Sequence, residues 1–452
     1  MALEVAAARQ ARIVFQRFGL GPKRGGPQRI GEDPRAALLD EIDRPNSALI
    51  TSGSLPGYRA ACADSQRDFA LPYEVFQQER RARLTQALKP EIGLLERLVT
   101  FWTNHFSMTV WKDQAILGTI GQLERDVIRP NVLGSFTQML LGVMRHPAMI
   151  AYLDNDDSIG PRSPIGKSWG AGFNENLARE VLELHTMGVG GGYTEGDVTA
   201  FARILTGWSY VRGWEADNEW NGGNDENRGQ FIFRADWHEP GGIELMGKRY
   251  PAAGQEQGEA VLRDLAVHPK TAEHLAFKLV LHFLTDEPTE AMVAPVADAF
   301  LSSGGDLGAT TRALVELPDA WSLPLKKLRT PYELAIAQYR ATGTDVPNDD
   351  DFWTFTEPMR ALDNLPWEYG PPDGYPDETA AWLNPDAMRV RLDTSLLFVD
   401  MFGADDWPVP ADLARDLFDS ALSQPSKVAL RKPADNRGAM TLLLMLPEFQ
   451  RR

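Results

Sequence analysis

Two histidines lie at the centre of apolar helical faces, and their side chains have the types and positions that chemistry needs. In NENLAREVLELHTMGV, residues 174–189, helical spacing places His185 in the middle of an arc of leucine, alanine and valine. In ERLVTFWTNHF, residues 96–106, His105 takes the same position. Because a buried imidazole needs a partner, the two side chains either have ordinary core partners or share a site. A shared site would support metal binding or acid–base catalysis.

The carboxylates around His185 divide between the two sides of the helix. Glu180 lies at the boundary of the apolar arc, so it is the candidate acid or base beside the imidazoles. Glu183 is about 160° away from His185 on a regular helix, and we expect that the two do not bind one ion. Arg179 is four residues from both Glu175 and Glu183, which predicts surface ion pairs.

These residues lead to a first functional hypothesis, a buried catalytic centre formed by His105, Glu180 and His185. Neutral imidazoles could hold zinc or iron and leave one position open for water or oxygen. His238, in WHEPGG at residues 237–242, is the candidate third metal ligand. The reaction would be metal-assisted hydrolysis or oxidation of a cell-envelope or peptide substrate. The simpler alternative is two core histidines with backbone partners.

Composition excludes several classes of protein. The formal net charge is −17, and no basic cluster interrupts it, so neither nucleic acid nor an anionic membrane surface is an expected partner. The single cysteine, Cys62, excludes a disulfide scaffold. Charged residues break up the first twenty positions, and no apolar run could span a bilayer. We therefore expect a cytoplasmic protein, or one exported with a signal-bearing partner.

The elements that must position these side chains are mostly helices. Apolar periodicity predicts a mainly all-α, multi-helix protein with long polar loops and one small β-hairpin near 230–250. Asp33-Pro34 and the Thr194/Asp197 pair are typical helix starts. We divide the chain into an N-terminal helical region at 1–88, a central helical core at 89–345, and a loop with C-terminal helices at 346–452.

A long loop at about 346–385 is rich in aromatic and acidic residues. Trp367 and Trp382 are its candidate ligand-binding residues, because indole rings can stack on a sugar or a peptide. Aromatic side chains that cover a core produce the same composition, so both interpretations stay open.

Several motifs occur in order along the chain: FWTNHF, LERDVIRPNVLGSF, RHPAMIAYLDN, NENLAREVLELHTMGVGGGYTEGDV and ARILTGW. Together they resemble the bacterial DUF1800 family, a domain of unknown function. The resemblance covers nearly the whole chain and implies a mainly helical fold, but no agreed chemistry. Carried over by position, it adds Asn104, Arg179 and Trp208 as candidate ligand contacts. One departure is the hairpin motif, in which Ile243 stands where the family has a lysine.

The resemblance also implies a second functional hypothesis. Genes of this family often neighbour genes for sulfatase-like or phosphatase-like proteins, and many members carry export signals. A non-catalytic helical scaffold that binds or matures such a partner would fit the same sequence.

Overall fold

The computed structural model shows a mainly helical protein, which confirms the predicted fold class. It describes residues 2–51, 55–61, 70–347, 352–403, 407–433 and 435–452. About 61% of the chain is helical. Cys62 and positions 348–351 of the long loop lie outside the described residues.

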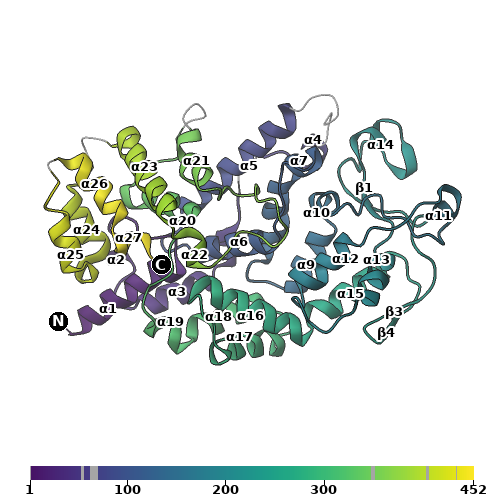
Figure 1. The fold of residues 1–452 in the computed structure, drawn as a ribbon, viewed down its shortest axis with the longest axis horizontal. Helices are drawn as coiled ribbons and strands as arrows, with labels where there is room; N and C mark the ends of the chain where they lie inside the picture. Colours follow the sequence, from purple (N-terminus) through teal and green to yellow (C-terminus); the bar gives the residue numbers. More distant parts are fainter. Residues whose placement is uncertain (1, 52–54, 62–69, 348–351, 404–406, 434) are drawn as a thin grey trace.

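The first third of the chain forms helices that run across the length of the molecule in Figure 1. They are α1 (Ala2–Ile13), the π-helix η1 (Val14–Phe18), α2 (Gly26–Arg29), α3 (Pro34–Ile42), η2 (Pro45–Ala48), α4 (Tyr58–Ala61), α5 (Ala70–Leu88), α6 (Leu94–His105), α7 (Gln114–Leu123), the π-helix η3 (Glu124–Ile128), α8 (Arg129–Asn131) and α9 (Phe136–Met144).

The middle of the chain carries the residues of greatest chemical interest. Its helices are α10 (Pro147–Tyr152), α11 (Pro164–Trp169), α12 (Asn176–Glu180), the π-helix η4 (Val181–His185), α13 (Glu195–Ile204), α14 (Gly213–Asp217), η5 (Trp220–Gly222), α15 (Gln255–Ala266), α16 (Pro269–Phe283), α17 (Glu290–Ser302), α18 (Leu307–Glu316) and α19 (Pro318–Ser322).

The last third of the chain is also helical. Its helices are α20 (Pro331–Thr342), α21 (Phe352–Ala361), α22 (Thr379–Trp382), α23 (Pro385–Phe402), α24 (Pro410–Phe418), η6 (Asp419–Ala421), α25 (Gln424–Ala429), α26 (Asn436–Met445) and α27 (Pro447–Gln450).

Two hydrophobic clusters hold these helices together (Figure 1). The larger cluster is built mainly from α6, α7, α9, α10, α12, α13, α15 and α16. The smaller one surrounds α20, which packs against α21 and α23, and it also contains residues of α24 and α26. Both clusters consist of leucine, valine, isoleucine, alanine and aromatic side chains, whose burial drives folding. The candidate histidines belong to helices of the larger cluster.

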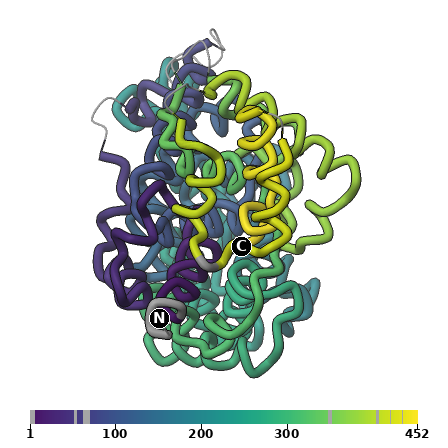
Figure 2. The backbone as a smooth tube through the Cα atoms, turned by 90° about the vertical axis from the view of Figure 1, so that its left-hand side faces the viewer, coloured from purple at the N-terminus to yellow at the C-terminus, as the bar shows by residue number. Residues whose placement is uncertain are grey.

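The two ends of the described chain lie side by side, as Figure 2 shows. The Gln16 side chain, in η1, donates a hydrogen bond to the carbonyl oxygen of Glu448, in α27, at 2.9 Å. Arg451, three residues after Glu448, forms an isolated antiparallel bridge with Leu328. The C-terminal segment is therefore built into the interior of the fold.

The β-structure differs from the single predicted hairpin. Strand β1 (Trp208–Tyr210) pairs antiparallel with β2 (Phe231–Phe233), whereas β3 (Ile243–Leu245) pairs with β4 (Lys248–Tyr250). The prediction that 229–236 pairs with 243–250 is therefore wrong. Met246 and Gly247, with φ of 50° and 73°, form the tight turn inside the second segment. A three-residue strand such as β1 is too short to show an alternating pattern.

Both predicted helix starts are confirmed. The side chain of Asp33 accepts a hydrogen bond from the backbone N–H of Ala36, ahead of Pro34 at the first helical position. Thr194 and Asp197 form a reciprocal capping box at the start of α13. Among the described residues, none of the helices combines the length and apolar character that crossing a bilayer requires.

Candidate active site

The two predicted histidines meet in the interior. His105 ends α6 and His185 ends η4, and they are 1% and 0% exposed. Their ring centroids are 5.9 Å apart. The Nε2 atom of His105 lies 3.1 Å from the carbonyl oxygen of His185. Because a carbonyl only accepts, Nε2 carries the proton and the other ring nitrogen, Nδ1, has a free lone pair.

The carbonyl of His185 is available because the helix ends there in a π-turn. Residues at the end of a helix have carbonyl groups without intrahelical partners. Gly188 follows with φ of +80°, and a Cβ atom at that position would come within 2.8 Å of the His274 ring. Glycine therefore both ends the helix and lets α16 approach. π-turns are often found at functional sites.

A third group completes the cluster, and the sequence analysis did not identify it. The Nζ atom of Lys278, in α16, lies 3.3 Å from Nδ1 of His105. Lysine only donates here, so Nδ1 is the acceptor, in agreement with the tautomer set by His185. The signal was present in the sequence, because His274, Lys278 and His282 are spaced four residues apart on one face of α16.

Burial keeps the imidazoles of the cluster neutral. It lowers the pKa of His105 well below its ordinary value, and the nearby Lys278 lowers it further. The pKa of His185 falls to about 3 and that of His274 to about 4, mainly for the same reason. His274 is held by the carbonyl oxygen of Leu184, at 3.1 Å. Both ring nitrogens of His185 are buried, and neither has a hydrogen-bond partner among the residues that the structure describes.

Burial also lowers the pKa of Lys278, against the opposing charges of Asp377 and Asp373. In the described part of the chain, the one hydrogen bond of this side chain is the bond to His105. Partial burial without a carboxylate in ion-pair contact disfavours the charged form of a lysine.

Glu180 lies at the edge of this region, half-buried, and not in hydrogen-bond contact with either imidazole. Burial raises its pKa, the charge of Glu183 raises it further, and Asp373 adds to the effect. The charge of Asp373 also acts on Lys278 and on Tyr152. We call Tyr152, Glu180 and Asp373 the acidic rim, because the two carboxylates act on one another and on the neutral Tyr152 hydroxyl.

The acidic rim is partly supplied by a loop segment, residues 369–377, that is fixed to the end of α6. The Asn104 side chain donates to the carbonyl oxygen of Tyr375 at 2.9 Å and accepts from its N–H at 2.7 Å. Gly374, with φ of +83°, passes so close that a Cβ atom would lie 2.4 Å from the Asn104 carbonyl oxygen. Asn104, a predicted ligand contact, is thus occupied by the loop.

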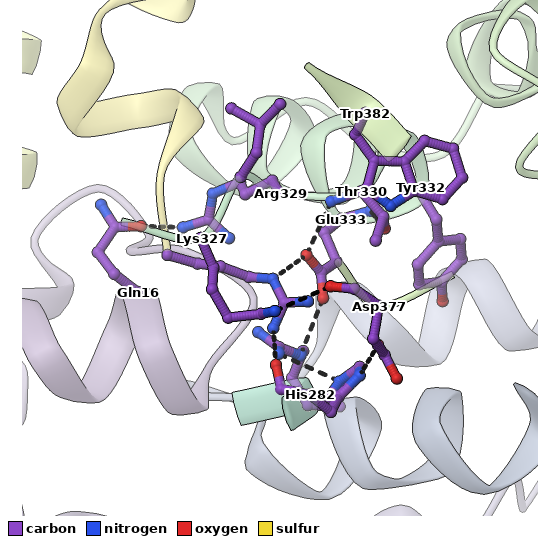
Figure 3. A network of polar contacts seen from close by, with 12 residues as sticks. Gln16, His282, Lys327, Arg329, Thr330, Tyr332, Glu333, Asp377 and Trp382 are labelled. Atoms are coloured by element: carbon purple, nitrogen blue, oxygen red, sulfur yellow. Dashed lines mark hydrogen bonds and ion pairs between the residues drawn. The ribbon is translucent and has the colours of Figure 1, made fainter. Parts of the chain in front are cut away.

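A buried ionic network anchors the next part of the loop (Figure 3). His282 Nδ1 lies 2.6 Å from a carboxylate oxygen of Asp377, and Lys327 donates to the Asp377 carbonyl oxygen at 2.8 Å. Burial alone would raise the pKa of Asp377, but His282 and neighbouring cations lower it to about 2. The loop is therefore fixed beside Lys278.

Glu333, at the first turn of α20, is the acidic centre of the same network. Its carboxylate lies 3.1 Å from Arg97 and 2.8 Å from Arg452. These cations overcome the effect of burial and lower its pKa to about 2. Figure 3 shows Glu333 between the loop residue Asp377 and the segment that carries Lys327 and Arg329.

The other predicted ligand contacts have structural partners. Trp208 is buried in β1, where its ring lies against Gly258. Trp367 is buried with φ of +67°, and its carbonyl accepts from the Val110 N–H at 2.9 Å. Trp382 is 7% exposed and donates to the Pro376 carbonyl oxygen at 3.0 Å. The two loop tryptophans thus cover the interior.

The predicted ion pairs of Arg179 are confirmed. Its guanidinium lies 3.5 Å from Glu175 and 3.2 Å from Glu183, and it also contacts Glu195 at 2.8 Å. Glu183 is partly exposed whereas His185 is buried, so the two side chains occupy different environments, as expected.

A small, mainly apolar cavity is lined in part by Asn104. Its volume is about 60 Å³, which leaves room for a few water molecules. Arg83, Glu124, Trp367 and Tyr375 are among its lining residues.

The side chains present do not form a metal-ligand set. His238 does not join His105 and His185, because its ring nitrogens lie 3.1 Å from the Thr206 carbonyl oxygen and 3.2 Å from Gln257 Oε1. Both ring nitrogens of His105 are also engaged, one of them by the amine of Lys278. Within the described ranges, no group of three His, Cys, Asp or Glu residues is arranged for a metal ion.

Comparison with known proteins shows the family of this chain. Residues 13–451 match the model of the family described as "Protein of unknown function (DUF1800)". The chain therefore belongs to this family, as its motifs indicated.

One curated relative is similar over part of the chain. An N-(5'-phosphoribosyl)anthranilate isomerase from Aeropyrum pernix is 24% identical over 187 residues, which are 41% of this chain and 71% of that protein. Its name supports neither a hydrolase nor an oxidoreductase. No solved structure matches the chain.

Proposed function

We propose that this member of the DUF1800 family is an enzyme whose reactive group is the amine of Lys278. The observation that carries the proposal is the 3.3 Å contact between Lys278 Nζ and His105 Nδ1, beside the carbonyl of His185. That carbonyl fixes the ring of His105, so Nδ1 points its lone pair at the amine. A lysine with a lowered pKa and a positioned imidazole is a common arrangement for acid–base and nucleophilic chemistry.

The roles of the neighbouring residues follow from their positions. His105 is a positioning residue, because it orients the amine and can accept a proton from it. Glu180 has a raised pKa, so it can hold a proton at a pH where an ordinary glutamate is ionised. The pKa of Lys278 is lowered and that of Glu180 is raised, and the charge of Asp373 acts on both groups. Lys278 is therefore the proposed base, and Glu180 is the proposed acid.

The chemistry proposed here needs no metal ligand set. The predicted zinc or iron centre used His105, His185 and His238, and the positions of their ring nitrogens do not support it. His185 instead supplies a carbonyl to His105 and an unpartnered ring beside Lys278. A hydrolytic reaction on a cell-envelope or peptide substrate remains compatible with an amine that removes a proton from water.

Competitive acylation with trace acetic anhydride tests the proposal on the intact protein. The acylation rate of Lys278 is followed by mass spectrometry as a function of pH, with the exposed Lys270 as internal reference. We expect the half-maximal rate of Lys278 below pH 10.5, its ordinary pKa, because the amine is partly buried beside His105. A midpoint at or above 10.5 would overturn the enzyme proposal and favour the non-catalytic scaffold for a sulfatase-like or phosphatase-like partner.

A further inference from the structure

We infer that Lys278 forms an imine with an uncharged or cationic aldehyde or ketone. The inference rests on the proposed function and names the substrate class of the same site. It depends on three features of the described residues: the environment of the amine, the acceptor beside it, and the charge of the acidic rim.

The first feature is an amine without an ionic partner. Most buried lysines pair with a carboxylate, but Lys278 has His105 as its one hydrogen-bond partner in the described structure. Its other close neighbours, His185 and His274, are neutral and buried. An uncharged amine has a lone pair on nitrogen, which attacks carbonyl carbon, whereas an ammonium ion has none.

The second feature is the acceptor at 3.3 Å, Nδ1 of His105. When the nitrogen of Lys278 attacks a carbonyl carbon, a C–N bond forms and the carbonyl oxygen becomes a hydroxyl group. The proton lost from nitrogen passes through Nδ1 to that oxygen. In the second step the remaining N–H proton and the hydroxyl group leave as water, and a C=N bond forms. No oxidant or reductant is required.

The third feature selects the charge of the substrate. Glu180 and Asp373 repel one another, as the raised pKa of Glu180 reflects, and Glu183 adds a further negative charge. A substrate with a carboxylate or phosphate would meet this repulsion at short range. An uncharged or cationic carbonyl compound would not, so the acidic rim favours those substrates.

Reductive trapping tests the inference without knowledge of the natural substrate. The intact protein is incubated at pH 7 with sodium cyanoborohydride and either glyceraldehyde, which is uncharged, or pyruvate, which is an anion. Mass spectrometry then quantifies the adduct on Lys278 and on Lys270. We expect Lys278 to react faster with glyceraldehyde than Lys270 does, by about tenfold for each unit by which its pKa is lowered. Pyruvate should give much less adduct at Lys278.

Two variants control the experiment. Lys278→Arg should lose the adduct at this position while adducts on other lysines remain. His105→Phe removes the acceptor and should slow trapping at Lys278, with a shift of its pH profile that a purely structural change would not cause. The matched variant Lys270→Arg should leave trapping at Lys278 unchanged.

The outcomes separate this inference from the proposed function. If acylation shows a lowered pKa but glyceraldehyde labels Lys278 no faster than Lys270, the imine is overturned and the acid–base role stands. If pyruvate labels Lys278 as fast as glyceraldehyde does, selection by the acidic rim is overturned. If acylation shows an ordinary lysine, both proposals fail together.

Discussion

The Nε2 atom of His105 donates a hydrogen bond to the carbonyl oxygen of His185 over 3.1 Å. This bond joins the end of α6 to the end of η4 and decides which nitrogen of His105 faces α16. Nδ1 therefore receives the amine of Lys278. A backbone carbonyl thus sets the protonation pattern of a side-chain pair at the centre of the larger hydrophobic cluster.

Replacing Lys278 should remove reactivity without loss of stability. Lys278→Met keeps a side chain of similar length and removes an amine whose desolvation is not offset by an ion pair. We expect the free energy of unfolding in urea to equal or exceed that of the natural protein, because groups retained for function often cost stability. A loss above about 2 kcal/mol would show that the amine is a structural partner of His105 instead.

Four buried histidines and the partly buried His274 predict a steep loss of stability in mild acid. Burial lowers the pKa of His105, His146, His185, His274 and His282 in the folded protein, to values of about 3 or 4 where the shift is quantified. These groups are neutral in the fold but gain protons in the unfolded chain below pH 6.5. Their contribution to stability is therefore present above pH 6.5 and is lost as the pH falls toward 4.

The size of that loss is measurable by urea unfolding between pH 7 and pH 5. Each proton bound only by the unfolded chain costs about 1.4 kcal/mol per pH unit. Glu79, whose pKa burial raises to about 7, acts in the opposite direction, as do Glu41 and Glu180, whose pKa burial also raises. The five histidines outnumber these carboxyl groups, so we expect a net loss. A free energy of unfolding that stays constant over this range would show that the imidazoles are accessible to protons in the fold.

The contact between Asn104 and Tyr375 predicts how the loop segment is held. Asn104→Ala removes two hydrogen bonds to the loop backbone and should cost about 1–2 kcal/mol, with faster proteolysis within residues 369–377. Asn104→Asp is the matched variant, because it keeps the acceptor for the Tyr375 N–H but faces the Tyr375 carbonyl with a carboxylate. Equal proteolysis of all three proteins would show that the ionic network alone fixes the loop.

The buried network around Glu333 should be sensitive to a change of charge. Glu333→Gln leaves Arg97 and Arg452 without their shared carboxylate in the interior, which should cost about 3–5 kcal/mol. Glu195→Gln changes an exposed ion pair of Arg179 and should leave the melting temperature almost unchanged. Similar melting temperatures for the two variants would indicate that water reaches the Glu333 network.

The helical fold and the meeting of two histidines were predictable from the sequence, because both depend on local periodicity. His105 and His185 each lie at the centre of an apolar arc, and such arcs pack together. The pairing of β2 with β1 was not predictable, since it depends on a three-residue strand after Gly207. The place of His238 beside Gln257 also depends on contacts between distant segments.

Lys278 shows a different limit of sequence reasoning. Its spacing from His274 and His282 is visible, but its contact with His105 requires α16 to approach η4 across Gly188. Trp367 and Trp382, the predicted ligand contacts of the loop, are both buried, and their ligand-binding role stays a prediction. In each case the deciding fact is the distance between segments, which periodicity does not encode.

The most direct test of the central claim is the protonation state of Lys278 itself. NMR of lysine side-chain nitrogens, assigned by comparison with Lys278→Met, follows that state as the pH is raised from 6. We predict that Lys278 changes from ammonium to amine below pH 10.5, because burial beside His105 disfavours its charge. In His105→Phe the transition should move, since the acceptor is gone. A Lys278 signal that remains ammonium up to pH 10.5 or above, in both proteins, would contradict the claim that its amine is the reactive group.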